Sequence, residues 1–208
     1  MDNANAPIYN QSLRGYTIAR KTAETDITLR LELDGKGVYQ VDTGCGFLNH
    51  MLELFCRHGS FDLTVCCKGD TWVDDHHTVE DVGICLGKAF QQALGEMRGI
   101  TRYGSFILPM DEVLMVCAVD LSGRAHLGWQ VELPTEKVGT FDTELGKEFW
   151  LAFVRSCPSA VHLKQLAGEN SHHILEAVFK GMGRALRQAV AIEPGKENEI
   201  PSTKGMLV

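Results

Sequence analysis

Two adjacent pairs of histidines are the residues of this chain best suited to chemistry. Segment 76–80 reads HHTVE and segment 172–176 reads HHILE. Successive side chains on a helix are about 100° apart, so the two imidazoles of a pair point towards different ions. The glutamate lies roughly 40° around the axis from the first histidine and 60° from the second, so its carboxylate can join either. The pattern predicts ligands for two metal ions.

The helix start at each pair favours imidazole in its ligating form. Asp75 and Ser171 directly precede the pairs and belong to the residue types that cap helix N-termini. The positive end of a helix disfavours imidazolium, so we expect neutral imidazoles. One such pair is usually polar helix surface, but two copies in the same register favour a metal site. Imidazole and carboxylate without thiolate suit manganese, iron or zinc, and spacing alone does not choose among them.

The histidine pairs belong to an internal repeat. Segments 76–94 and 172–190 are identical at eight of nineteen aligned positions and carry apolar residues at the same seven offsets. Those offsets follow one face of a helix. Another candidate helix precedes each copy, at 47–59 and 143–155, and these two share a Phe-x-Arg sequence. We therefore expect two pairs of similar helices.

Strand-like segments complete a common order in the two halves. Stretches rich in β-branched and apolar residues precede the first helix of each half, with turns expected at Asp34–Gly35 and Ser122–Gly123. A short strand follows that helix, as FDLTVCC in one half and AVHLKQL in the other. The order is strand, strand, helix, strand, helix in both. This is an α+β pattern used twice, and the helices must cover one face of each sheet.

The domain organisation follows from the repeat. The boundary lies near Thr101, which gives one repeat of about 14–100 and another of about 101–192. We expect them to pack as one compact domain spanning 1–208. The tail at 193–208 has Gly, Pro and charge without periodicity, so we expect it to be extended or mobile.

Composition excludes several classes of protein. The chain has 208 residues, 44% hydrophobic, with a net charge of -7 and no basic stretch, so nucleic acid is not an expected partner. No apolar run approaches the roughly 18 residues of a membrane span, and the first eleven residues do not resemble a secretory signal. The seven cysteines form no C-x-x-C motif. We expect reduced thiols packed as small apolar residues, with a catalytic thiol as the lesser alternative, in a cytoplasmic protein.

The motifs around these residues resemble one enzyme family, imidazoleglycerol-phosphate dehydratase of histidine biosynthesis. The similarity extends from about Arg20 to the C-terminus. The matching segments are TAET at 22–25, GFLNHML at 46–52, RHGSFDL at 57–63, DDHHTVEDVGICLG at 74–87, DLSGR at 120–124, LAGENSHHILEAVFKG at 166–181 and PSTKG at 201–205. The resemblance implies a duplicated α+β fold like the second domain of ribosomal protein S5. It also implies a hollow particle of 24 subunits with active sites between subunits.

The same resemblance implies two Mn²⁺ ions per active site, although other divalent metals are not excluded. Eight residues match the family's ligand positions: His50, His76, His77, Glu80, Glu148, His172, His173 and Glu176. Shared by two ions, they give four ligands each and leave two octahedral positions for substrate.

The implied reaction removes water from imidazole glycerol phosphate and gives imidazole acetol phosphate. The proton to be lost lies on an unactivated carbon, so an electron sink is needed. Metal coordination can hold the ring as imidazolate, which can expel the neighbouring hydroxyl through a diazafulvene-like intermediate. Glu24, in the TAET motif, is the candidate base, and Asp111 is a second candidate for proton transfer. Without the resemblance, Glu24 would read as a solvated carboxylate.

The substrate phosphate requires cations and hydrogen-bond donors. The residues matching family positions that contact it are Arg102, Arg124, Lys180, Ser202 and Lys204. Taken singly, such residues are ordinary surface charges. Two of them lie in the tail, which we therefore expect to become ordered over bound substrate.

Three positions depart from the family pattern, and other functions stay open. Glu148 stands where many relatives have His, Asn49 replaces an Asp, and Leu54 replaces a common Gln. No D-x-D-x-T motif is present, so a fused phosphatase is not expected. One alternative is a dinuclear metal hydrolase of phosphate esters. A non-enzymatic alternative is a metal-dependent assembly protein whose histidine pairs only bridge subunits.

Overall fold

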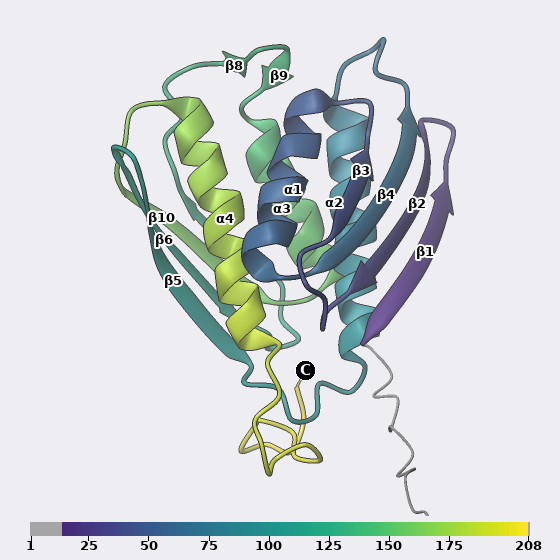
Figure 1. Cartoon of the computed structure of the whole chain (residues 1–208), viewed down its shortest axis with the longest axis vertical. Helices are drawn as coiled ribbons and strands as arrows, with labels where there is room; N and C mark the ends of the chain where they lie inside the picture. Colours follow the sequence, from purple (N-terminus) through teal and green to yellow (C-terminus); the bar gives the residue numbers. More distant parts are fainter. Residues whose placement is uncertain (1–13, 208) are drawn as a thin grey trace, which may run out of the picture.

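Two sheets enclose a layer of four helices in the computed structural model, which describes residues 14–207 (Figure 1). The N-terminal segment, with the expectation that it holds no secretory signal, lies outside the described residues. The first half contains β1 (Gly15–Lys21), β2 (Thr25–Glu32), β3 (Tyr39–Asp42), α1 (Gly46–Gly59), β4 (Asp62–Gly69) and α2 (His76–Leu94). The second half contains β5 (Tyr103–Met110), β6 (Val113–Asp120), β7 (His126–Gln130), β8 (Lys137–Val138), β9 (Phe141–Asp142), α3 (Leu145–Ser156), β10 (Ala160–Ala167) and α4 (Ser171–Ala189).

The two four-stranded sheets have the same topology. Their strand orders are β1-β2-β4-β3 and β5-β6-β10-β7. The last strand of each order is parallel to its neighbour, and the other pairs are antiparallel. The predicted α+β class and its repeated unit are confirmed. No helix among the described residues is long and apolar enough to cross a membrane.

The predicted strand order was wrong in one respect, because three strands of each four-stranded sheet precede the first helix of that half. β1 and β5 are edge strands, in which β1 has no fully buried residue and β5 has apolar residues such as Ile107 at exposed positions, so their sequences lack the apolar alternation that marks a strand. The chain does turn at Asp34–Gly35 and Ser122–Gly123. However, these turns do not join neighbouring strands, because β4 lies between β2 and β3, and β10 lies between β6 and β7.

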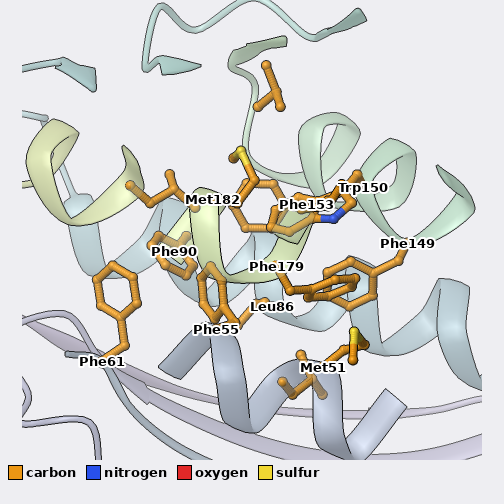
Figure 2. Packing of buried hydrophobic residues seen from close by; sticks show 14 of the residues in the cluster. Met51, Phe55, Phe61, Leu86, Phe90, Phe149, Trp150, Phe153, Phe179 and Met182 are labelled. Atoms are coloured by element: carbon orange, nitrogen blue, oxygen red, sulfur yellow. The ribbon is translucent and has the colours of Figure 1, made fainter. Parts of the chain in front are cut away.

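The core lies between the helices and the inner faces of the sheets. β2 and β6 alternate buried and more exposed residues along their length, as one covered face requires. Aromatic rings fill the helical layer and come from all four helices (Figure 2). Trp150 of α3 contacts Phe55 of α1 and Phe179 of α4 with ring centroids 6.0 and 5.2 Å away. The repeats therefore share this apolar centre.

Each helix of the first half packs against a helix of the second half. α2 packs on α3, and α1 packs on α4. A Cβ on Gly87 would lie 2.6 Å from the carbonyl oxygen of Phe153, and a Cβ on Gly183 would lie 2.6 Å from that of Phe55. The glycines are equivalent in the repeat, and so are the phenylalanines. One backbone contact is thus used twice to join the halves.

The tail is a series of turns and not an extended segment. The tail packs beside the loop that contains Gly99. The Gly99 N–H donates to Glu199 O at 2.8 Å, and the Gly99 carbonyl accepts from Glu193 N at 2.8 Å. Arg98 Nη1 donates to Asn198 O at 2.9 Å. These long-range hydrogen bonds leave no periodic signal in sequence.

The glycine contact between α2 and α3 can be tested by Gly87→Ala. Alanine favours a helix, but here its Cβ would overlap the Phe153 carbonyl, so we expect the free energy of unfolding to fall by about 1–3 kcal/mol. Urea denaturation measures this change. Gly46→Ala in α1 is the control, because no atom lies within 4 Å of its added Cβ. Equal midpoints for the two variants would contradict the proposed close contact.

Candidate active site

Three predicted ligands meet where α1 and α4 begin. His50 Nε2 lies 2.7 Å from Glu176 Oε1, and His172 Nε2 lies 3.4 Å from the same oxygen. Their ligand atoms all lie within 4.8 Å of one another. Two imidazoles and a carboxylate are a donor set that fits Mn²⁺, Fe²⁺ or Zn²⁺. Among residues 14–207, this is the one group of three or more His, Cys, Asp or Glu side chains close enough to hold an ion.

The second oxygen of Glu176 is held by a cation. Lys180 Nζ lies 2.8 Å from Oε2 and is one helical turn further along α4. Burial alone would raise the pKa of Glu176, but the hydrogen bonds from Lys180 and His50 outweigh it, so its pKa lies below the usual value. Glu176 is therefore a carboxylate at neutral pH, with one oxygen turned towards the two imidazoles.

The second histidine of each pair has carboxylates on both sides of its ring. His77 Nδ1 lies 3.1 Å from both oxygens of Asp70, and Nε2 lies 3.6 Å from Glu24 Oε1. His173 Nδ1 lies 2.9 Å from Glu112 Oε2, and Nε2 lies 3.9 Å from Asp111 Oδ2. Both proton-transfer candidates thus face equivalent histidines.

These carboxylates oppose the expected effect of the helix start on the imidazoles. The hydrogen bond to Asp70 raises the pKa of His77, and the one to Glu112 raises the pKa of His173. In turn, His173 lowers the pKa of Glu112 to about 2. These hydrogen bonds therefore counteract the helix start, which by itself disfavours imidazolium.

The hairpin that carries Glu24 is tied to α2. Asp81 of α2 is 5% exposed and accepts hydrogen bonds from Arg20 Nη1 and, at 2.5 Å, from Thr25 Oγ1. Within the turn, Thr22 Oγ1 accepts from the backbone N–H groups of Glu24 at 3.1 Å and Thr25 at 3.0 Å. The turn is thus fixed from both sides, while the Glu24 side chain is 51% exposed.

The remaining predicted ligands are placed by the repeat and do not meet in a second group of three. Glu148 precedes Phe153 by five residues, just as His50 precedes Phe55, so it is the counterpart of His50. It lies on α3, which packs on the helix that carries His76 and Glu80. All three are half-buried.

Four of the five predicted phosphate-binding residues lie at one end of the molecule, and Lys180 lies apart from them. Arg102 lies at the far end of α4, where its N–H donates to Ala189 O and its Nη1 donates to Pro201 O at 2.9 Å. The tail with Ser202 and Lys204 lies at this same end (Figure 1). Arg124 follows the end of β6 there, next to Ser122. Lys180 instead lies beside Glu176.

The distance between the histidines at the start of α4 and Arg102 at its end is large compared with a small substrate. α4 has 19 residues, so it spans roughly 28 Å between His172 and the end that carries Arg102. An open pocket of about 550 Å³ lies at the histidine end, beside His172, His173 and Lys137. The histidine end can therefore admit a ligand, but this chain's own Arg102 cannot reach it.

Neither predicted N-cap is used as expected. Asn170 caps α4 by accepting from the N–H groups of His172 at 2.9 Å and His173 at 3.3 Å, whereas Ser171 is the first helical residue. At α2, Asp74 Oδ1 accepts from His76 N at 2.8 Å, and Asp75 makes no cap hydrogen bond. The cap of α4 therefore lies one residue earlier than predicted, whereas Asp75 is the N-cap residue of α2, as predicted, but without a cap hydrogen bond from its side chain.

The cysteines do not provide a thiolate nucleophile. Six of the seven are buried, and only Cys66 is exposed. Burial raises the pKa of Cys85 to about 11 and that of Cys117 to about 12. Such thiols stay protonated at neutral pH, which disfavours the alternative of a catalytic thiol.

Three acidic residues of the site were missed by sequence reasoning. Asp81 and Glu112 contact residues 56 and 61 positions away, and Asp70 contacts His77, seven positions away. Asp81 lies within the DDHHTVEDVGICLG segment and Glu112 lies beside Asp111, which was the available signal. Nothing in their own spacing distinguishes them from surface acids.

The anchor of the Glu24 hairpin can be tested by Asp81→Ala. We expect a loss of about 1–3 kcal/mol, because Arg20 and Thr25 lose their buried partner while Arg20 stays a quarter exposed. Chemical denaturation measures it. Asp26→Ala in the same hairpin removes only an exposed partner of Lys21, so its change should stay within about 0.5 kcal/mol. Comparable losses in both variants would exclude a special role for Asp81.

Comparisons with known proteins show which family this fold belongs to. Residues 43–186 match the family model described as imidazoleglycerol-phosphate dehydratase. The imidazoleglycerol-phosphate dehydratase of Dinoroseobacter shibae is 56% identical over 195 residues, which cover 94% of this chain and 100% of that relative.

Two crystal structures share the fold. That of imidazoleglycerol-phosphate dehydratase from Staphylococcus aureus has a TM-score of 0.79 and 38% identity, covering 86% of this chain and 99% of the other. That of IGPD from Pyrococcus furiosus in complex with (S)-C348 has a TM-score of 0.79 and 36% identity, covering 91% and 100%. With most of its length matched by the family model and by close relatives, the chain belongs to the imidazoleglycerol-phosphate dehydratase family.

Proposed function

We propose that this protein is a carbon–oxygen lyase that dehydrates imidazole glycerol phosphate to imidazole acetol phosphate in histidine biosynthesis. The observation that carries the proposal is the group of His50, His172 and Glu176, which lies within the segment matched by the family model. The same end of the molecule also presents Glu24 beside His77. Ligands and a candidate base therefore share one face.

The histidines and glutamates would hold two Mn²⁺ ions per active site. The His50 group supplies three ligands of one shell, and His76, Glu80 and Glu148 are their counterparts for a second. When bound, such ions supply the electron sink, because they lower the pKa of the substrate imidazole N–H and favour imidazolate. Glu148 supplies oxygen in place of the family's nitrogen, which suits manganese.

Proton transfer falls to the carboxylates of the two hairpins. The reaction takes hydroxyl from the carbon next to the ring and a proton from the following carbon, so one water leaves and the enol becomes the ketone. Glu24 Oε1 is half-exposed and held 3.6 Å from His77 Nε2, a position from which it can accept that proton. Asp111 holds the matching position beside His173 and is the second proton-transfer group.

The phosphate would be bound by residues of another subunit. The histidine end and the Arg102 end lie too far apart for one small substrate to contact both in one chain. Assembly into the 24-subunit particle implied by the resemblance would join the two ends across subunits. Arg102, Arg124, Ser202 and Lys204 would then bind phosphate, with Lys180 beside the ligands. We place this assembly in the cytoplasm.

The deciding experiment incubates the manganese-loaded protein with imidazole glycerol phosphate and follows the ketone and inorganic phosphate separately. We expect ketone with the phosphate retained. Glu24→Gln removes the base and should lower kcat by at least about 10²-fold. Its particle size and manganese content should not change.

The outcomes separate the alternatives. Release of inorganic phosphate without ketone would support a phosphoester hydrolase. Full activity of Glu24→Gln would remove Glu24 as the base while leaving the dehydration intact. Assembly that requires metal, without any turnover, would support the non-enzymatic alternative.

The tail's role is tested by deleting residues after Pro201. This removes Ser202 and Lys204, so we expect kcat/KM to fall by about 10²-fold or more while metal content stays the same. Steady-state kinetics and metal analysis measure the two effects. Removing only 206–208 is the control, because it keeps both phosphate ligands. Unchanged activity of the longer deletion would reject the role of the tail.

A further inference from the structure

The second histidine of each pair is held at the same ring nitrogen by a carboxylate. Asp70 contacts His77 Nδ1 with both oxygens at 3.1 Å, and Glu112 contacts His173 Nδ1 at 2.9 Å. A carboxylate at neutral pH only accepts hydrogen bonds, so Nδ1 must carry the proton in both rings. When the ring is neutral, its free lone pair is then on Nε2.

The two carboxylates come from non-equivalent positions of the repeat. Leu29 of β2 lies opposite Val65 of β4, and Cys117 of β6 lies opposite Leu163 of β10, so the sheets share one register. Glu112 lies five residues before Cys117. Its counterpart, five residues before Leu29, is therefore Glu24 and not Asp70.

A β-bulge in β10, between Gln165 and Ala167, shifts this register at the other end of the strand. Lys68 lies opposite Asp26, and Ala167 lies opposite Leu114, the counterpart of Asp26, so the counterpart of Asp70 is Glu169. The Glu169 side chain is exposed. Glu112 of the β5–β6 hairpin reaches the same nitrogen instead. The same ring nitrogen is thus held by residues from different positions of the repeat. This indicates that the carboxylate contact with Nδ1 is functional and was not simply retained from the duplicated unit.

We propose that Asp70 and Glu112 are positioning residues that fix His77 and His173 with Nε2 presented to metal. The proposal rests on the metal-binding function above. It also explains why the β1–β2 and β5–β6 hairpins use their carboxylates differently. Because Asp70 holds His77, Glu24 is left free for proton transfer. In the second half Glu112 takes the holding role, and the neighbouring Asp111 occupies the outer side of the ring.

The surroundings of each carboxylate support a rigid holding role. Asp70 is 8% exposed, and its N–H donates to Glu24 O at 3.1 Å, which links the base-bearing turn to His77. Glu112 Oε1 accepts from Asn170 N at 3.0 Å, so it is also fixed to the cap of α4. Carboxylates that orient a ligating imidazole typically strengthen metal binding by 10–100-fold.

The test is Mn²⁺ titration of the assembled Asp70→Ala and Glu112→Ala variants, with free Mn²⁺ followed by electron paramagnetic resonance. We expect the dissociation constant to rise by about 10–100-fold for the ion bound by the affected histidine. Excess Mn²⁺ should restore most of the turnover, which it would not do for a misfolded chain. Glu169→Ala is the control, because it removes an exposed acid beside Asn170 and should leave the dissociation constant within about twofold.

Other outcomes overturn the proposal in distinguishable ways. If the unmodified protein binds Mn²⁺ and both variants bind it equally well, Asp70 and Glu112 are not positioning residues, while the metal function stands. If the unmodified protein binds no divalent metal, the metal function falls and this proposal falls with it. If an alanine variant fails to assemble, Asp70→Leu or Glu112→Met keeps most of the side-chain volume and removes the acceptor oxygens. An unchanged dissociation constant in that variant would equally overturn the assignment.

Discussion

The close contact between helices of opposite repeats is the constraint on which the site depends. Gly87 meets the Phe153 backbone, and Gly183 meets the Phe55 backbone, so α2 lies on α3 and α4 lies on α1. Paired helices run in the same direction (Figure 1), which brings their N-terminal ends together. His50 of one repeat therefore reaches Glu176 of the other. Neither repeat alone could assemble this group.

The two repeats share one backbone topology, but several side chains at equivalent positions differ in charge. Asp81 anchors the first hairpin, but its equivalent in α4 is Ala177, which carries no charge. Lys180 neutralises Glu176, but its equivalent in α2 is Ile84. In the first half a charged residue of the helix therefore holds the hairpin that carries Glu24. In the second half it holds the predicted metal ligand Glu176. Substitutions of a few side chains are enough for this, since the backbone contacts that align the helices are unchanged.

What could be predicted from sequence is what depends on local periodicity. The spacing of His76, His77 and Glu80 and its copy predicted helices and ligands, because helical geometry fixes side-chain directions within a few residues. Strands β1 and β5 were missed because their exposed residues obscure the alternation. The contact of Glu112 was missed for a different reason. Its carboxylate accepts a hydrogen bond from His173, which lies 61 residues away and comes close only after the sheet and helix have packed.

The two proton-transfer candidates differ in how firmly they are held. Asp111 lies in a two-residue turn with a φ of +47° and is 70% exposed. Glu24 lies in a turn anchored by Asp81, and its backbone carbonyl accepts from Asp70 N. A base must stay within hydrogen-bond reach of its proton through the transition state, and each loosely held rotamer lowers the fraction of time it does so. The better anchored backbone favours Glu24 as the base, while the exposed Asp111 is better placed to exchange protons with water.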